Sequence, residues 1–283
     1  MEILHTVAEM QTRADKMRTA GKTTAFVPTM GYLHEGHLSL LRIGKNNGDD
    51  LVLSIFVNPA QFGPNEDLAS YPRSLETDLK LAEQEGVDAV FIPTDKALYQ
   101  EGYQTYVQLD KLPGHLCGLS RPVFFKGIAT VVTQLFNIVK PRVAVFGEKD
   151  FQQLAIIRQL VTDLKFDISI LGGPIVREID GLAMSSRNAY LKPEMRPAAL
   201  SLSQALTMAQ EMVHEGICAT DVIVEKTKRH FAQHSSIEVD YISICDPSTL
   251  DGVAAVEQDS LMALAVNLDK IRLIDNRILK GKK

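Results

Sequence analysis

The chain has 283 residues, of which 45% are apolar, 23% charged and 6% aromatic. This is ordinary globular composition, so it excludes a disordered or collagen-like chain, and the length suits about two domains. The formal net charge is −5 at pH 7 and no basic stripe is present, which argues against nucleic acid as a partner.

The cysteines and the apolar runs of the sequence indicate in which cell compartment the protein works. The three cysteines lie far apart without Cys-x-x-Cys spacing, which argues against a disulfide framework and a thiolate zinc site. The N-terminus lacks the apolar segment of a signal peptide, and no apolar run approaches the roughly 20 residues that cross a bilayer. We therefore predict a cytoplasmic protein without a membrane partner. Lys280, Lys282 and Lys283 predict a solvated tail.

The first part of the chain predicts alternating helices and strands. Thr6 and Glu9 have capping-box spacing, which predicts a helix that stops at Gly21. Continuous apolar runs, typical of a parallel sheet covered on both faces, predict strands at 25–27, 51–57, 89–92, 142–146 and 168–176. Helical patterns lie at about 36–46, 74–86, 127–139 and 150–165. This alternation predicts a doubly wound, Rossmann-like parallel sheet.

The pattern changes after about residue 177. Helices are predicted at about 194–215 and 220–233, and strands at 239–244, 260–266 and 271–279. Helices followed by strands predict a smaller α+β domain with an antiparallel sheet. We therefore place the domains at 1–176 and 177–283, with the joint at 177–193.

The segment from Pro28 to His37 follows a predicted strand and opens a predicted helix. Open parallel sheets bind ligands at the carboxyl ends of their strands, and helix N-termini favour anions. His34 and His37 can donate hydrogen bonds to phosphate oxygens there. A zinc site of the His-Glu-x-x-His type is excluded, because it needs histidines four residues apart and these are three apart. The alternative is that His34 caps a turn and His37 lies on the helix surface.

The segment from Gly147 to Gln153 has the same strand-to-helix setting. Lys149 can neutralise phosphate charge, and Asp150 can accept a hydrogen bond from a ribose hydroxyl. The alternative is that Asp150 caps the helix, because Gln153 stands at the capping-box position.

Two further polar segments are candidates. Met184 to Asn188, in the predicted joint, carries hydroxyls and a guanidinium that can close over a triphosphate. Asn58 to Phe62 follows a strand, where amides can orient a small polar substrate. An ordinary loop is the alternative for both. No Walker loop, strand-linked Gly-x-Gly-x-x-Gly or Gly-x-Ser-x-Gly elbow is present in the sequence.

Together these segments resemble one family over almost the whole chain. FVPTMGYLHEGH, SIFVNPAQF, FGEKDFQQL, DGLAMSSRN and RLIDN resemble the pantothenate synthetases, the family of pantoate–β-alanine ligases. The His-x-Gly-His element is similar to the wider nucleotidylyltransferase superfamily shared with class I aminoacyl-tRNA synthetases. The serine-rich loop stands where a Lys-Met-Ser-Lys-Ser signature would be.

The resemblance implies a two-step reaction without a covalent enzyme nucleophile. ATP and pantoate give pantoyl adenylate and pyrophosphate, and the amine of β-alanine then gives pantothenate and AMP. The protein has to orient the carboxylate and stabilise the charge that develops. Magnesium is implied by ATP, bound mostly through phosphate oxygens, and its protein ligands are not assigned. The family is typically a cytoplasmic homodimer.

The resemblance also assigns roles residue by residue. The catalytic residues implied are His37, His34 and Lys149. The ATP-binding residues implied are Met30, Gly31, Tyr32, Leu33, His34, Glu35, Gly36, His37, Gly147, Glu148, Lys149, Asp150, Val176, Met184, Ser185, Ser186 and Arg187. Gln61 and Gln153 are implied to bind pantoate, and Gln61 also β-alanine. Pro28 and Met30 are implied to contact the gem-dimethyl group.

One stretch departs from the family pattern. Arg121-Pro122 is normally followed by Gly-His-Phe-Arg-Gly, whereas this chain has Val-Phe-Phe-Lys-Gly. Phe124 thus replaces a histidine, and Lys126 replaces an arginine and loses its bidentate fork.

Two other interpretations of the function stay open: another adenylate-forming or cytidylyl-transferring enzyme of the superfamily, or a non-catalytic nucleotide-binding protein. The glutamine segments argue against the first, and the presence of His37 and Lys149 against the second.

Overall fold

The computed structural model describes residues 1–64 and 66–281, so Lys282 and Lys283 of the predicted tail lie outside the described residues. The chain divides into two compact units. Unit 1 comprises 1–110, 121–148 and 156–175, and unit 2 comprises 111–120, 149–155 and the chain from Val176 onward. The predicted domain limits differ from these units, because they put 111–120 and 149–155 in the N-terminal domain.

Gln152 explains how these two segments come to lie together in unit 2. Its side chain is only 6% exposed. The Cys117 N–H donates to Gln152 Oε1 at 3.0 Å, and Gln152 Nε2 donates to the carbonyls of Leu112 and His115 at 2.9 and 2.7 Å. These three bonds tie 149–155 to 111–120. The amide of Asn276 in turn donates to the Lys149 carbonyl, which joins 149–155 to the C-terminal strand of the unit.

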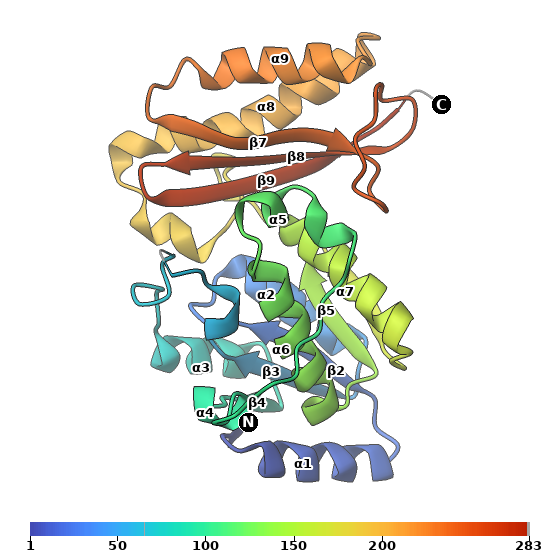
Figure 1. The fold of residues 1–283 in the computed structure, drawn as a ribbon. Coiled ribbons are helices and arrows are strands. Elements are labelled where there is room, and N and C mark those ends of the chain that lie inside the picture. The colour runs from blue at the N-terminus through green and yellow to red at the C-terminus, as the bar shows by residue number, and fades with distance from the viewer. Residues whose placement is uncertain (65, 282–283) are drawn as a thin grey trace. The chain divides into compact units, whose positions relative to one another are not determined.

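Unit 1 is built on six parallel strands in the order β1-β4-β3-β2-β5-β6 (Figure 1). The strands are β1 (Glu2–Leu4), β2 (Thr24–Thr29), β3 (Asp50–Ile55), β4 (Ala89–Phe91), β5 (Val143–Gly147) and β6 (Ser169–Gly173). The predicted strands are confirmed, and β3 and β4 are buried at every position. The strand predicted at 168–176 is shorter, and β6 is buried only at Gly173. β1 was not predicted, since it is three residues long and two of them are exposed.

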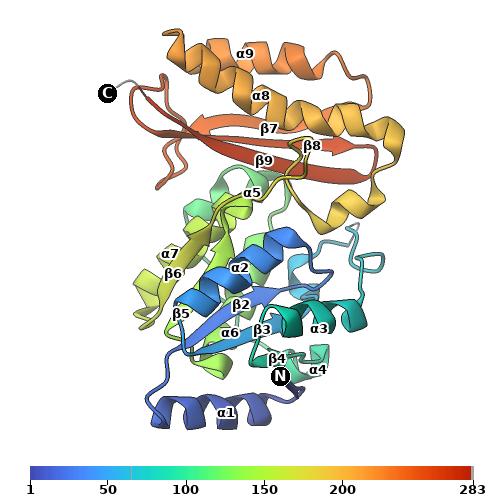
Figure 2. The ribbon, with the colours of Figure 1, turned by 180° about the vertical axis from the view of Figure 1, so that it is seen from behind.

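Helices cover both faces of this sheet. They are α1 (Val7–Thr19), α2 (Glu35–Asn46), α3 (Leu75–Gln84), α4 (Asp95–Leu98), α6 (Phe124–Val139) and α7 (Phe151–Leu164), of which the first turn belongs to unit 2. The capping box of Thr6 and Glu9 is confirmed at the start of α1. α2 packs against α3 on the face seen in Figure 2, and α1 packs against α6. The predicted doubly wound fold is confirmed.

The sheet order reverses direction between β2 and β5. Such a switch point is where open parallel sheets bind ligands, beyond the carboxyl ends of the strands. β2 pairs with β3 along its whole length, from Thr24 to Thr29, but its ladder to β5 in the described chain is confined to Ala25 and Phe26. The strand ends that follow, Pro28–Thr29 and Phe146–Gly147, lead directly into two of the predicted functional segments.

Unit 2 carries the predicted α+β fold. Its main elements are α5 (Cys117–Ser120), α8 (Arg196–His214), α9 (Thr220–Phe231), β7 (Ile237–Cys245), β8 (Ser260–Leu268) and β9 (Ile271–Leu279). The three strands form an antiparallel sheet in the order β7-β8-β9, and α8 and α9 lie side by side on it (Figure 1). Leu202 and Leu206 of α8, Phe231 of α9 and Leu264 of β8 pack in one apolar core. This part of the predicted fold is also confirmed.

Candidate active site

The loop that follows β2 is held in a strained shape by a buried carboxylate. Gly31 has φ +81°, and a Cβ there would lie 2.9 Å from Asp78 Oδ2. Tyr32 has φ +52°, an uncommon conformation for a residue with a side chain. Asp78 of α3, 2% exposed, accepts hydrogen bonds from the N–H groups of Tyr32 and Leu33 at 2.8 and 2.7 Å. Asp78 therefore fixes the loop that leads to the two histidines.

His34 and His37 lie together at the N-terminus of α2. His34 is the N-cap residue, and its carbonyl accepts from the His37 N–H at 2.7 Å. The His34 N–H donates in turn to His37 Nδ1 at 3.3 Å, and the two ring centroids are 4.0 Å apart. Because Nδ1 accepts this bond, the neutral His37 ring carries its proton on Nε2, where it can be donated. The capping interpretation and the phosphate-binding interpretation of His34 are therefore compatible.

Asn58 and Gln61 form a buried amide pair after β3. Asn58 is the N-cap of the short 3-10 helix Pro59–Gln61, which ends at Gln61, and the Ala60 N–H donates to Asn58 Oδ1 at 3.3 Å. Asn58 Nδ2 donates to Gln61 Oε1 at 3.1 Å, and Gln61 Nε2 contacts Met30 Sδ at 3.3 Å. The structure thus brings together two of the predicted substrate-binding residues, Gln61 and Met30. Asn58 was considered from the sequence only as one amide of this segment, without a ligand of its own.

Gly127 allows α6 to approach this amide pair closely. A Cβ at Gly127 would lie 2.3 Å from the Ala60 carbonyl oxygen, so a larger residue does not fit. The Gly127 carbonyl accepts a second hydrogen bond from Asn58 Nδ2 at 3.2 Å. The N-terminal end of α6 is therefore part of the wall behind Gln61.

Two of the departures from the family pattern, Phe124 and Lys126, take part in aromatic–cation contacts. The Arg121 guanidinium lies 3.6 Å from the centroid of the Phe124 ring and forms an ion pair with Glu66. Lys126 Nζ lies 4.3 Å from the centroid of the Tyr106 ring. Phe124 therefore offers Arg121 an apolar face, and Lys126 keeps a cation over an aromatic ring.

The segment from Gly147 to Gln153 is divided between the two units, because unit 1 includes Glu148 and unit 2 begins again at Lys149. Lys149 Nζ lies 4.0 Å from Asp150 Oδ2, and the Lys149 side chain is 19% exposed. Asp150 ends a short 3-10 turn that runs directly into α7. Within the described residues no hydrogen bond joins Asp150 to Gln153, so the capping box expected as the alternative role for this pair is not formed.

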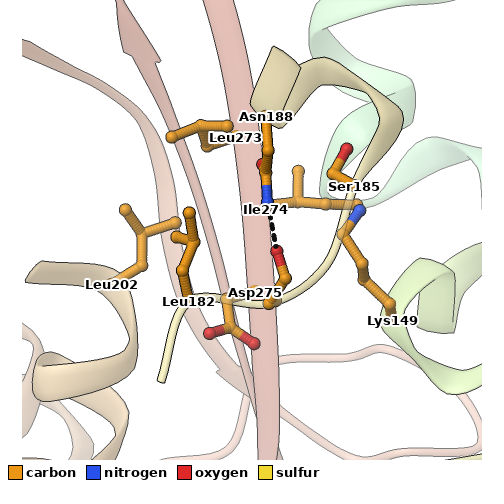
Figure 3. Close-up of a pocket in the computed structure, with 9 residues that line it drawn as sticks. Lys149, Leu182, Ser185, Asn188, Leu202, Leu273, Ile274 and Asp275 are labelled. Atoms are coloured by element: carbon orange, nitrogen blue, oxygen red, sulfur yellow. Dashed lines mark hydrogen bonds between the residues drawn. The ribbon is translucent and has the colours of Figure 1, made fainter. Parts of the chain in front are cut away.

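Lys149 and the serine-rich loop line one small pocket of unit 2 (Figure 3). Its polar residues are Lys149, Ser185, Asn188 and Asp275, and Figure 3 draws the Lys149 side chain pointing toward Ser185. Asn188 Nδ2 donates to the Ala183 carbonyl at 3.1 Å, and Asp275 accepts from Arg177 at 2.7 and 3.0 Å. The structure therefore brings together Lys149 and Ser185, which the sequence assigned to one ligand.

The serine-rich loop is itself ordered by local bonds. The Met184 N–H donates to the Val176 carbonyl at 2.9 Å, so these two predicted ATP-binding residues are adjacent. Ser185 caps the next 3-10 turn by accepting the Arg187 N–H at 3.3 Å, and Ser186 is 7% exposed.

The described residues, 1–64 and 66–281, contain no group of three or more histidine, cysteine or acidic side chains placed to hold a metal ion. In the same residues, no helix has the length and apolar character needed to cross a membrane.

Comparison with known proteins decides the family. The model of the pantoate–β-alanine ligases matches residues 2–278. The chain belongs to this family. A pantothenate synthetase of Desulfatibacillum aliphaticivorans is 59% identical over 280 residues, which cover 99% of this chain and 100% of that protein. A pantothenate synthetase of Syntrophobacter fumaroxidans is 56% identical over 99% of both chains.

Solved structures of pantoate–β-alanine ligases agree. A crystal structure of the pantothenate synthetase of Thermus thermophilus has a TM-score of 0.94 at 40% identity and covers 99% of this chain and 100% of its own. The ligase of Francisella tularensis, complexed with β-γ ATP and β-alanine, has a TM-score of 0.82 at 31% identity, covering 98% of this chain and 97% of its own. The predicted family and enzyme class are confirmed: the chain is a ligase of pantothenate biosynthesis.

Proposed function

We propose that this ligase works through pantoyl adenylate. A carboxylate oxygen of pantoate attacks the α-phosphorus of ATP, and the bond to the pyrophosphate leaving group breaks. The neutral amine of β-alanine then attacks the acyl carbon, loses a proton and displaces AMP, which leaves pantothenate. Adenylation gives the carboxylate a good leaving group, so no enzyme nucleophile is required. The ATP and β-alanine bound to the Francisella tularensis relative support these two ligands for this chain.

The pair of histidines at the N-terminus of α2 is the observation that carries the proposal. This helix starts at the switch point of the sheet, where phosphate groups are favoured by free N–H groups and by the helix dipole. His37 has Nδ1 engaged by the His34 N–H, which leaves Nε2 as the donor. We propose that His37, His34 and Lys149 stabilise the negative charge that develops as pyrophosphate leaves.

The remaining roles follow the family resemblance. We propose that Gly147 and Asp150 meet the ribose, that Val176 lies beside the adenine, and that the loop Met184–Arg187 contacts the phosphates. For the acid, we propose Gln61 and Gln153 as hydrogen-bonding residues, with Met30 and Pro28 as apolar contacts. The bond between Gln61 Nε2 and Met30 Sδ supports the pairing of a polar and an apolar contact in one subsite.

Magnesium is proposed to enter with ATP, bound through phosphate oxygens. The described residues gather no set of metal-ligating side chains, so no protein ligands are assigned to the ion. A cytoplasmic homodimer, with no nucleic acid or membrane as partner, completes the proposal from the family resemblance. The division into an N-terminal catalytic domain and a C-terminal lid is proposed on the same ground.

An isotope exchange assay tests the proposal. With ATP, magnesium and pantoate, labelled pyrophosphate is expected to enter ATP when β-alanine is left out, because the first half-reaction is complete without the amine. Exchange that requires β-alanine would contradict the two-step reaction. Exchange with other carboxylic acids but not with pantoate would instead favour a different adenylate-forming enzyme of the superfamily.

A further inference from the structure

A half-buried tyrosine lies behind the amide pair of Asn58 and Gln61. The Tyr99 hydroxyl lies 2.8 Å from Asn58 Oδ1, and Asn58 Nδ2 lies 3.1 Å from Gln61 Oε1. Asn58 is 2% exposed and Gln61 7% exposed. Tyr99, Asn58 and Gln61 therefore form a hydrogen-bonded chain of three side chains, here called the Tyr99 relay. It ends at Gln61 Nε2, next to Met30 Sδ.

The direction of every bond in the Tyr99 relay is fixed by backbone groups. The Ala60 N–H can only donate, so the Asn58 atom that it meets at 3.3 Å is the oxygen. The Gly127 carbonyl can only accept, so the Asn58 atom that it meets at 3.2 Å is the nitrogen. Asn58 thus accepts from Tyr99 and donates to Gln61. Gln61 must then turn its oxygen inward, which leaves its NH2 group facing Met30.

Tyr99 is itself well supported. Its ring packs edge-on against Tyr103, with centroids 5.1 Å apart, and Tyr103 packs in the same way against Tyr106 at 5.5 Å. Gln134 Nε2 donates to the Tyr103 hydroxyl at 3.2 Å. Burial raises the pKa of the Tyr99 phenol, so the hydroxyl keeps its proton and stays a donor to Asn58.

We infer that Tyr99 is a positioning residue for Gln61, because the Tyr99 relay holds the Gln61 amide with its nitrogen toward the substrate. The thioether of Met30 is a weak acceptor, so the Gln61 NH2 group can exchange this contact for a stronger bond to oxygen. The relay therefore selects a carboxylate or hydroxyl oxygen that accepts a hydrogen bond. This inference rests on the proposed role of Gln61 in acid binding and adds the residue that orients it.

Tyr99→Phe tests the inference, because it removes the hydroxyl and keeps the ring that packs on Tyr103. Without the bond at 2.8 Å, Asn58 Oδ1 retains the longer bond to the Ala60 N–H. We expect the KM for pantoate in pyrophosphate exchange to rise about 3–10-fold, the range of one lost neutral hydrogen bond. The KM for ATP and kcat are expected to stay within about two-fold. Tyr103→Phe is the matched control, because its hydroxyl bonds to Gln134 and not to Asn58.

A second pair of variants shows whether Tyr99 acts through Gln61. In a Gln61→Ala background, Tyr99→Phe is expected to cause no further loss of pantoate affinity, because the end of the relay is already missing. An equal loss in both backgrounds would overturn the inference, and so would an unchanged KM for pantoate in the single variant. A rise in the KM for ATP of the same size would also overturn it, since that would indicate a general structural role.

A measurement without substrate separates the Tyr99 relay from the proposed function. In ¹⁵N-labelled protein, Tyr99→Phe is expected to shift the side-chain NH2 signals of Asn58 and Gln61, whereas Tyr103→Phe leaves them in place. Gln61→Ala identifies the Gln61 signals by their loss. Unmoved signals in Tyr99→Phe would overturn the relay. Wild-type protein that does not bind pantoate, with the signals moving as expected, would overturn the proposed function alone.

Discussion

Asp78→Asn is expected to slow adenylation although Asp78 belongs to α3 and not to the histidine motif. The carboxylate accepts two backbone N–H groups of the loop before His34, at 2.8 and 2.7 Å. An asparagine keeps one oxygen but turns an NH2 group toward the other N–H. One charge-assisted bond is lost, at a cost of about 1.5–3 kcal/mol, and two donors then face each other.

The loss is expected in kcat rather than in the KM for ATP. If this free energy is added to the cost of holding His37 in its reactive position, the exchange rate falls about 10–100-fold, since each 1.4 kcal/mol is a factor of ten. Removing the negative charge of Asp78 acts in the opposite direction on the binding of an anionic ligand, which protects the KM for ATP.

Pyrophosphate exchange at saturating ATP and pantoate, beside a melting curve, measures both effects. Asp88→Asn is the control, because the Asp88 carboxylate accepts one N–H, that of Leu51, at the start of β3 and far along the strand from the histidine loop. Its exchange rate is expected to match the wild type. Exchange at the wild-type rate in a folded Asp78→Asn protein would refute the argument that Asp78 aims the histidines.

The other predictions concern the site residues directly. His37→Ala and Lys149→Ala are each expected to lower exchange by about 10²–10³-fold, the scale of a lost transition-state donor, with the melting temperature kept; wild-type exchange in either folded variant would assign that side chain a structural role. Asp150→Asn is expected to weaken ATP binding measured by calorimetry, because a charge-assisted bond to the ribose becomes a neutral one, and unchanged affinity would leave Asp150 without a ribose contact. Gln153→Ala is expected to weaken pantoate binding by about 1–3 kcal/mol without changing the melting temperature. The same change at the adjacent Gln152 is expected to lower the melting temperature, because that side chain makes three hydrogen bonds. Equal melting temperatures for the two glutamine variants would contradict this contrast.

Most of the fold could be predicted from local sequence patterns. The central strands β3 and β4 of unit 1 are buried at every position, so each shows as a continuous apolar run between helices. β1 could not be predicted, because its three residues form a strand by pairing with β4 and not through a local apolar run. Its residue Glu2 pairs with Ala89, which is 87 positions away. That residues 111–120 and 149–155 belong to unit 2 could not be predicted for a similar reason. It depends on Gln152, whose partners are 35 to 40 positions away.

The candidate site divides in the same way. His34 and His37 interact within one helical turn, so their spacing alone indicates that they act together. Asp78 and Tyr99 act across 46 and 41 positions, and no local motif joins them to the residues they hold. Asp78 does carry one signal, because it lies four residues before Ala82 on the buried face of α3. A charged residue on such a face has to find a partner, and here the partners are the N–H groups of the histidine loop.

The most direct test of the adenylate follows oxygen atoms from pantoate. Pantoate labelled with ¹⁸O in both carboxylate oxygens is incubated with ATP, magnesium, β-alanine and the enzyme, and the nucleotide product is analysed by mass spectrometry. Attack of the carboxylate on the α-phosphorus predicts AMP that carries one ¹⁸O, with the second in the amide carbonyl of pantothenate. Unlabelled AMP, or ADP formed together with labelled orthophosphate, would contradict the adenylate and place the attack elsewhere.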